Sequence, residues 1–148
     1  MGLNEMEARK QLERIPPARS EIQNLVAAAK KQLRDAKVAG LSLETKLVLA
    51  YQVIVVCART ALRANGYRVT LALGEHALTL ETLAFTVRSS KKLIAYFQAL
   101  RKKRHDDLYK GTLHVSATES TEAVARAEQL QRETVAYLKK NFKQLLGG

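Results

Sequence analysis

Apolar residues recur along most of this chain at the three- and four-residue spacing that places them on one face of a helix. The clearest early stripe consists of Leu25, Ala28, Ala29 and Leu33. It predicts a helix that follows Pro16-Pro17 and ends near residues 38–40. Ser20 and Gln23 fit a capping box at the start of this helix.

The stretch over residues 47–58 is apolar on almost every helical face. A helix of this kind needs partners all round, so we place it at the centre of a bundle. The four β-branched residues 53–56 would suit a buried strand, but the unbroken pattern of roughly 23 residues decides for a helix. Ser42 can cap this helix, and Asn65-Gly66 suits a left-handed turn at its C-terminal end.

The rest of the chain adds shorter elements. A polar opening segment runs to residue 14, and residues 67–74 form a loop or an extended passage. A short helix ends at Val87, and the next helix runs from Ser89-Ser90 to about Tyr109 and is closed by Gly111. A final helix spans about residues 121–146 and is capped by Ser116 or Ser120. We therefore expect an all-α fold, an up-and-down bundle of four to five helices. It forms a single domain over residues 1–148, with a core over about 20–146.

Positive charge is concentrated in one part of the chain. The 148 residues include 25 Lys and Arg against 14 Asp and Glu, a formal net charge of +11. Residues 88–110 carry eight basic and two acidic side chains, more than half of that net charge. Four consecutive cations lie within this segment: Arg101, Lys102, Lys103 and Arg104. Such a run is often a solvated helix face, but its concentration here favours a polyanionic partner.

Residue usage argues against several classes of chemistry. The single Cys57 lies in the apolar run, which predicts a small core residue and no intramolecular disulfide. The three histidines lack metal-ligand spacing, and the sequence has no phosphate-binding glycine loop or nucleophile elbow, so we expect no metal and no cofactor. A polar N-terminus, and no apolar stretch near the ~20 residues of a membrane span, predict a cytoplasmic protein.

The segment LRKKRHDDLYKG carries the most informative polar pattern. Helical spacing from the preceding apolar stripe places Arg101 and Arg104 on or beside the buried face, while the two lysines between them point outward. His105 and Tyr109, four residues apart, lie alongside and can donate or accept hydrogen bonds. A guanidinium beside a core needs a carboxylate, a phosphate or carbonyl oxygens as partners.

Two interpretations of Arg104 remain open from the sequence. In the first, it forms an ion pair with a carboxylate such as Asp35, Glu44 or Glu81 and holds the bundle together. In the second, it belongs to a cationic pocket that holds a nucleotide or RNA phosphate.

Several separate blocks of the sequence resemble a HEPN domain (higher eukaryotes and prokaryotes nucleotide-binding). The blocks are LETKLVLAYQVIVVCARTALRANGYRVT, GEHALTLETL, LRKKRHDDLY and TESTEAVARAEQL, and the resemblance covers roughly residues 20–140. It is closest to small prokaryotic members with an Ala-Tyr helix, a Gly-Tyr-Arg turn, a His-bearing loop and an Arg-(Asn/His)…Tyr motif. The matching positions in this chain are Tyr67-Arg68, His76, Arg104-His105 and Tyr109.

The resemblance implies an up-and-down bundle of four or five helices that is commonly dimeric. Many such proteins are metal-independent ribonucleases of toxin–antitoxin and antiviral systems, often partnered by a minimal nucleotidyltransferase. In the active members an Arg and a His with four to six residues between them meet across the dimer. Here three residues separate Arg101 from His105, and Arg104 adjoins His105. The apolar stretch 47–58 also predicts a homodimer, because one chain of few helices would leave part of it uncovered.

Three functions follow from these observations. We favour a non-catalytic HEPN-type module that binds RNA, a nucleotide or a protein partner, with a cognate nucleotidyltransferase or antitoxin among the expected partners. Its candidate binding residues are Arg68, Arg101, Lys102, Lys103, Arg104, His105 and Tyr109. The alternative is a metal-independent endoribonuclease, with His105 or His76 as base and Arg101 or Arg104 stabilising the phosphate. The third is a scaffolding helical bundle.

Overall fold

Helices account for most of the chain. The computed structural model describes residues 2–70, 74–110 and 114–147, with the backbone alone described over 106–110. Helical content is 74%, and the described part holds six α-helices, two short 3-10 helices and one two-stranded sheet. The predicted all-α bundle is confirmed.

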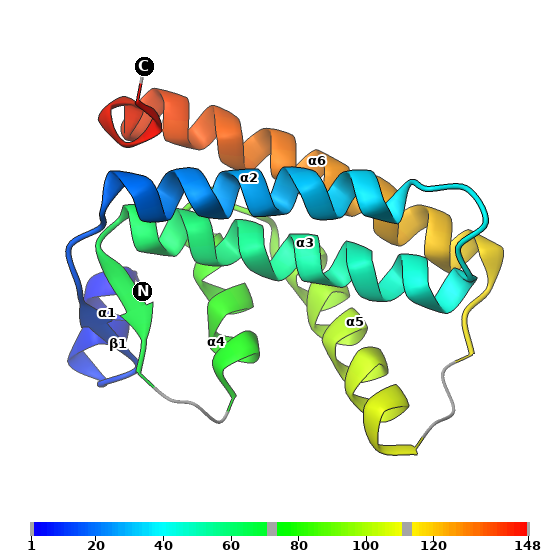
Figure 1. The fold of residues 1–148 in the computed structure, drawn as a ribbon. Helices are drawn as coiled ribbons and strands as arrows, with labels where there is room; N and C mark the ends of the chain where they lie inside the picture. Colours follow the sequence, from blue (N-terminus) through cyan, green and yellow to red (C-terminus); the bar gives the residue numbers. More distant parts are fainter. Residues whose placement is uncertain (1, 71–73, 111–113, 148) are drawn as a thin grey trace.

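Three long helices lie lengthwise beside one another (Figure 1). They are α2 (Arg19–Ala36), α3 (Leu43–Ala64) and α6 (Ala117–Asn141). All three pack against each other, and α3 and α6 both run antiparallel to α2. The short 3-10 helix η2 (Lys143–Leu146) follows α6 and packs back against α2, which brings the C-terminal end beside the start of that helix.

A second group of helices leaves this layer at a steep angle (Figure 1). It consists of α4 (Glu75–Glu81), the 3-10 helix η1 (Thr82–Ala84) and α5 (Lys91–Lys110). Each of them contacts α3, and α4 also contacts α5. Side chains from α3 can therefore reach both the long-helix layer and the α4–α5 group.

Capping chemistry sets the helix boundaries where the sequence predicted it would. The Ser42 side chain accepts a hydrogen bond from the Thr45 backbone N–H at 3.1 Å. Ser116 forms a complete capping box with Glu119 at the start of α6. Gly66 adopts a left-handed φ of +84° just after α3, as predicted for the end of that helix.

Other predicted boundaries are wrong. α2 begins at Arg19 with Ala18 as its N-cap, so Ser20 already lies in the first turn and the predicted capping box with Gln23 does not form. The final helix starts four residues before the predicted 121 and ends at Asn141, where the backbone tightens into η2. The predicted closing residue of α5, Gly111, lies outside the described residues.

α3 is largely covered by its own chain, with Val48 and Leu49 partly exposed. The helix is long and apolar enough to cross a membrane, but 78% of its most apolar window is buried inside the protein. It packs against α2, α4, α5 and α6, so it is the core helix of this fold. The apolar surface that motivated the predicted homodimer is thus largely covered within one chain, and dimerisation stays a prediction.

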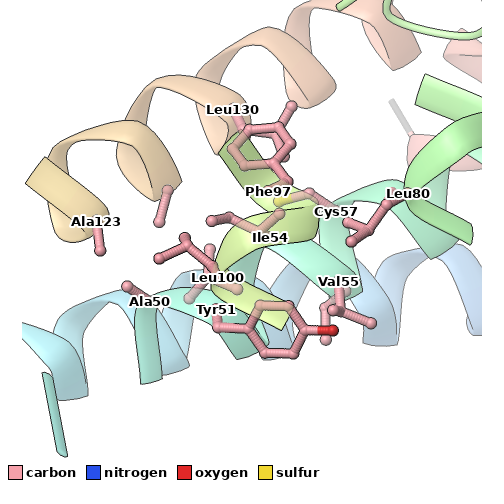
Figure 2. Close-up of a cluster of buried hydrophobic side chains, with 14 of the residues drawn as sticks. Ala50, Tyr51, Ile54, Val55, Cys57, Leu80, Phe97, Leu100, Ala123 and Leu130 are labelled. Carbon is pink, nitrogen blue, oxygen red and sulfur yellow. The ribbon is translucent and has the colours of Figure 1, made fainter. Parts of the chain in front are cut away.

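Figure 2 shows the main core cluster around α3. Phe97 of α5 and Leu130 of α6 pack on Ile54 and its neighbours. Cys57 is buried there, and burial raises the pKa of its thiol to about 12, which suits the predicted core role rather than a nucleophile. Tyr51 lies at the lower edge of the cluster in this view, on the side of α3 away from Leu130.

The N-terminal segment, predicted as a polar opening segment outside the core, is folded and contributes buried side chains. It forms α1 (Leu3–Ala8) and β1 (Leu12–Arg14), and β1 pairs antiparallel with β2 (Tyr67–Val69). Met6 and Leu12 are buried in a small core cluster of their own. Two buried apolar positions among so many polar ones give too weak a period for sequence analysis to detect.

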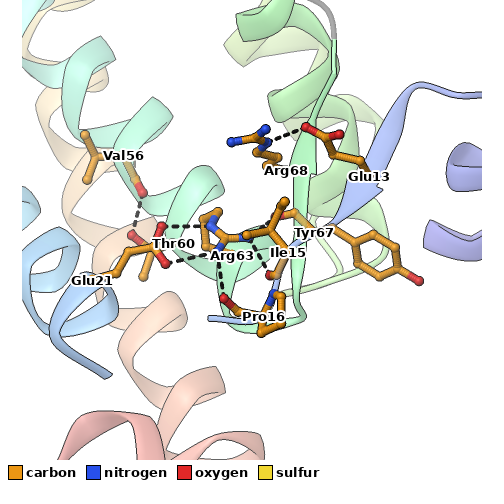
Figure 3. A network of polar contacts seen from close by, with 9 residues as sticks. All are labelled: Glu13, Ile15, Pro16, Glu21, Val56, Thr60, Arg63, Tyr67 and Arg68. Carbon is orange, nitrogen blue, oxygen red and sulfur yellow. Dashed lines mark hydrogen bonds and ion pairs between the residues drawn. The ribbon is translucent and has the colours of Figure 1, made fainter. Parts of the chain in front are cut away.

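Arg63, near the C-terminal end of α3, ties this segment to the bundle (Figure 3). Its Nε and Nη2 groups donate hydrogen bonds to the two carboxylate oxygens of Glu21, at 2.8 and 3.0 Å. Nη1 donates to the carbonyls of Ile15 and Tyr67, and Nη2 also donates to that of Pro16, at 3.0 to 3.3 Å. All five N–H donors of the guanidinium are thus used, and Arg63 is only 6% exposed.

Candidate functional site

Two polar side chains meet where α3 faces α4. Tyr51 of α3 is fully buried, and its hydroxyl lies 3.1 Å from Nδ1 of His76. The two ring centroids are 6.0 Å apart and the rings are tilted by 45°. α4 begins at Glu75, directly after Gly74 in a left-handed conformation, which places His76 in the first turn of the helix. The predicted His-bearing segment is therefore in contact with the central helix.

The burial of Tyr51 determines the direction of this hydrogen bond. Burial raises the pKa of Tyr51 to about 12, even though nearby arginines act to lower it, so the phenol keeps its proton. A buried O–H needs an acceptor, and His76 Nδ1 is the one hydrogen-bond partner that the described residues offer it. We therefore assign Tyr51 as the donor, which leaves the proton of neutral His76 on Nε2.

Arg104 of α5 lies over the ring of Tyr51, with its Cζ 5.6 Å from the ring centroid. Its Nε is buried and has no hydrogen-bond partner among the described residues. None of the described ion pairs joins Arg104 to Asp35, Glu44 or Glu81. An unpaired buried N–H lowers the free energy of unfolding by roughly 1–3 kcal/mol, whereas a partly exposed cation–π contact raises it by about 0.5–1 kcal/mol. Arg104 is therefore an incompletely satisfied cation.

Arg101 and Arg59 bring further positive charge to the same place. Arg101 Nε donates to Gln98 Oε1 at 2.7 Å. The amide nitrogen of Gln98 donates in turn to Glu81 Oε1 and to a backbone carbonyl of α4, both at 2.9 Å, which holds this part of α5 against α4. Arg59 of α3 makes a long contact of 3.4 Å with Glu75.

The titration of His76 reflects this charge balance. Burial lowers the pKa of His76, and the positive charges of Arg59, Arg104 and Arg101 lower it further. Glu75 acts in the opposite direction. Three guanidinium groups thus act electrostatically on the Tyr51–His76 pair, and among the described residues one carboxylate, that of Glu75, acts against them on His76. This local excess of positive charge, together with the unpaired Nε of Arg104, suits an anionic ligand.

We call Tyr51, Arg59, His76, Arg101 and Arg104 the Tyr51 cluster. The sequence left open whether His76 comes near Arg104, and the structure places both against one tyrosine.

Arg68, another candidate from the sequence, lies elsewhere. It is on β2, where it forms an ion pair with Glu13 of β1 (Figure 3).

The remaining candidates on α5 have other surroundings. Lys102 is exposed, as predicted for a residue pointing away from the bundle. Lys103, predicted to point outward as well, is instead half-buried and forms an ion pair with Glu119 in the first turn of α6. His105 is exposed on the helix surface. The side chain of Tyr109 lies outside the described residues.

Sequence reasoning did not assign Tyr51, Arg59 or Gln98 to the site. Two signals were available. Tyr51 is the one aromatic residue in the aliphatic run 47–58, and a buried Tyr needs a partner for its hydroxyl. Arg59 lies eight residues further along the same helix, a spacing that falls within one broad helical face.

Searches of protein-family models, curated proteins and solved structures give no match to this chain. The resemblance to HEPN domains therefore rests on the sequence motifs. Among the residues that the structure describes, no group of three or more His, Cys, Asp and Glu side chains is placed to hold a metal ion.

Proposed function

We propose that this protein is a non-catalytic, HEPN-type helical module that binds single-stranded RNA through its backbone phosphates. The observation that carries the proposal is the buried, unpaired Nε of Arg104, held within a group of three arginines. A phosphate oxygen supplies the missing acceptor, and the planar guanidinium can bind two such oxygens at once. We place this activity in the cytoplasm, within a toxin–antitoxin or defence system.

The distribution of charge favours a polymer over an isolated phosphate. Besides the arginines of the Tyr51 cluster, α5 carries the exposed Lys102, and the basic segment 88–110 adds further lysines and an arginine. The chain has five Tyr and three Phe, and Tyr51, Tyr67 and Phe97 are buried, so few aromatic side chains remain to stack on bases. Contact with the sugar-phosphate backbone, rather than base-specific recognition, is therefore the expected mode.

The tautomer of His76 favours binding over cleavage. With Nδ1 accepting from Tyr51, the proton on Nε2 makes His76 a second hydrogen-bond donor for a phosphate. A general base would need an unprotonated ring nitrogen free to take the 2′-OH proton, and Nδ1 is occupied. His76 therefore suits the role of an anion-binding donor.

The binding experiment is fluorescence anisotropy with a labelled single-stranded RNA at low and moderate salt. Arg104→Met keeps the apolar stem but removes the guanidinium, and we expect affinity to fall at least tenfold. Lys102→Met is the matched control, because it removes the same charge from an exposed position two residues away. We expect it to cost about twofold, since exposed charges are screened. Equal losses in the two variants would mean non-specific attraction and would overturn the proposal.

Cleavage is tested on the same proteins. Total RNA is incubated with the purified protein in EDTA and resolved on a denaturing gel, with Arg104→Ala and His105→Ala beside it. The proposal predicts intact RNA at high protein concentration. Discrete products that both variants lose would show a metal-independent endoribonuclease, with His105 next to Arg104 as its base, and would replace the binding module with an enzyme.

A further inference from the structure

A cavity of about 370 Å³ lies between the N-terminal segment, α3, β2 and α4. One part of its wall is apolar and includes Ile15, Pro16, Leu62 and Val69. Its size falls at the lower end of the range of ~300–1,000 Å³ for small-molecule pockets. The cavity is therefore large enough for one nucleoside-sized group and not for a folded segment of polymer.

Some charged groups of this cavity use all of their hydrogen-bond donors within the fold, and others do not. Arg63 and Glu21 line it, but they are bonded to each other, and every donor of Arg63 is used. Arg59 and Arg68 line it as well. Arg68 uses only Nε, on Glu13, and its Nη1 and Nη2 groups make no hydrogen bond to a described residue. Figure 3 shows the Arg68 guanidinium on the same side of β2 as Arg63.

Arg59 also has guanidinium donors that no described residue uses. Its one hydrogen bond to a described residue is the contact of 3.4 Å with Glu75, which also lines the cavity. Once the closed Arg63–Glu21 pair is set aside, Glu75 is the one carboxylate left in the lining beside Arg59 and Arg68, and Glu13 pairs with Arg68 Nε from outside the lining. The cavity thus joins an apolar wall to the unused guanidinium N–H groups of Arg59 and Arg68, which matches a ligand with an apolar ring and an anionic group.

Arg59 connects this cavity to the Tyr51 cluster. Its charge acts on His76, while its side chain lines the cavity wall. Tyr51 and Arg59 are eight residues apart on one helix, which corresponds to ~12 Å along its axis. Two places with unused guanidinium donors therefore lie along the same stretch of α3, with Arg59 shared between them.

We propose that the cavity is a second subsite for RNA, which receives the nucleotide next to the one whose phosphate the Tyr51 cluster holds. The RNA strand then follows α3 from Arg104 to Arg68, with a base or ribose against the apolar wall and a phosphate between Arg59 and Arg68. This inference rests on the proposed function and adds a direction and a minimum length to the bound RNA.

The test is a length series of unlabelled oligonucleotides, from one to four nucleotides, competing with a labelled tetranucleotide. For the unaltered protein we expect affinity to rise at least tenfold between the mononucleotide and the tetranucleotide. Arg68→Ala should remove most of this gain and leave mononucleotide binding within about twofold. Val69→Phe, which fills the cavity without changing charge, should do the same.

Arg14→Ala is the matched control for charge. It removes an exposed arginine from β1, next to the Glu13 that pairs with Arg68, and it does not line the cavity. We expect this variant to keep the full rise in affinity with oligonucleotide length. If Arg68→Ala and Val69→Phe keep it too, the subsite is wrong while RNA binding at the Tyr51 cluster stands. If Arg104→Met leaves even mononucleotide binding unchanged, the proposed function itself fails.

Discussion

Arg63 and Arg104 both place a guanidinium against the central helix α3, but their surroundings are opposite. Arg63 is 6% exposed and uses all five N–H donors, on a carboxylate and three backbone carbonyls. Arg104 has a buried Nε without a partner, and it lies beside a tyrosine ring and near two further arginines. One site is closed within the fold, and the other has donors that nothing in the described chain uses.

The difference separates a structural arginine from a ligand-binding one. A buried cation with every donor satisfied holds segments together, and any ligand would have to displace existing bonds. A cation with an unused buried donor makes the fold slightly less stable than it could be. The bound anion recovers that free energy, so the under-satisfied arginine is the one expected to bind.

The largest expected effect is on stability at Arg63. Arg63→Met leaves the Glu21 carboxylate and three carbonyls without their donor, and we expect the free energy of unfolding to fall by about 3 kcal/mol. Urea denaturation measures this loss. Arg132→Met is the control, since its exposed ion pair with Glu128 contributes less than about 0.5 kcal/mol. A loss at Arg63 no larger than at Arg132 would show that the closed network does not hold the fold.

The next effect is the pH dependence that His76 imposes. Its pKa in the folded protein lies below the value of 6.5 in the unfolded chain, so the unfolded state binds more protons as the pH falls through that value. The free energy of unfolding should therefore decrease between pH 7.5 and 5.5. Urea denaturation of His76→Gln should show a smaller decrease over the same interval, and an identical one would contradict the assignment.

RNA binding should respond to pH in the opposite direction. A bound phosphate favours the protonated imidazole, so the affinity for single-stranded RNA should rise as the pH falls from 7.5 to 5.5. Anisotropy titrations at several pH values measure this, with His76→Gln as the comparison. An affinity that rises equally in the variant would place the responsible titration outside the Tyr51 cluster.

The smallest expected effect is the stability of Arg104→Met. The variant removes an unpaired buried donor together with a weaker cation–π contact, so the free energy of unfolding should not fall. Urea denaturation beside Arg63→Met makes the contrast direct. A loss comparable to that of Arg63 would mean that Arg104 is also a structural residue.

Most of the fold was accessible from the sequence because its signals are local. Apolar periodicity gave the long helices, and Ser42 and Ser116 cap two of them by hydrogen bonds to residues three positions away. The β1–β2 pairing joins Leu12 to Val69, and no local pattern encodes a contact over that separation.

The site was accessible only in part. Helical spacing from the apolar stripe correctly placed Arg101 and Arg104 beside the buried face of α5. Spacing could not reveal that Tyr51 and His76 meet, because their contact depends on how α3 and α4 pack. For the same reason, the sequence offered three carboxylates for Arg104, whereas the structure pairs it with none of them.

The most direct test of the central claim is a titration of RNA dinucleotide into isotope-labelled protein, monitored by NMR at the arginine Nε–H groups. The spectrum of Arg104→Met assigns the Arg104 signal, and Arg63 serves as an internal control. We predict that the Arg104 signal shifts and saturates as its Nε–H gains a phosphate oxygen, while the Arg63 signal stays in place. An Arg104 signal that does not move while RNA binds would contradict the account.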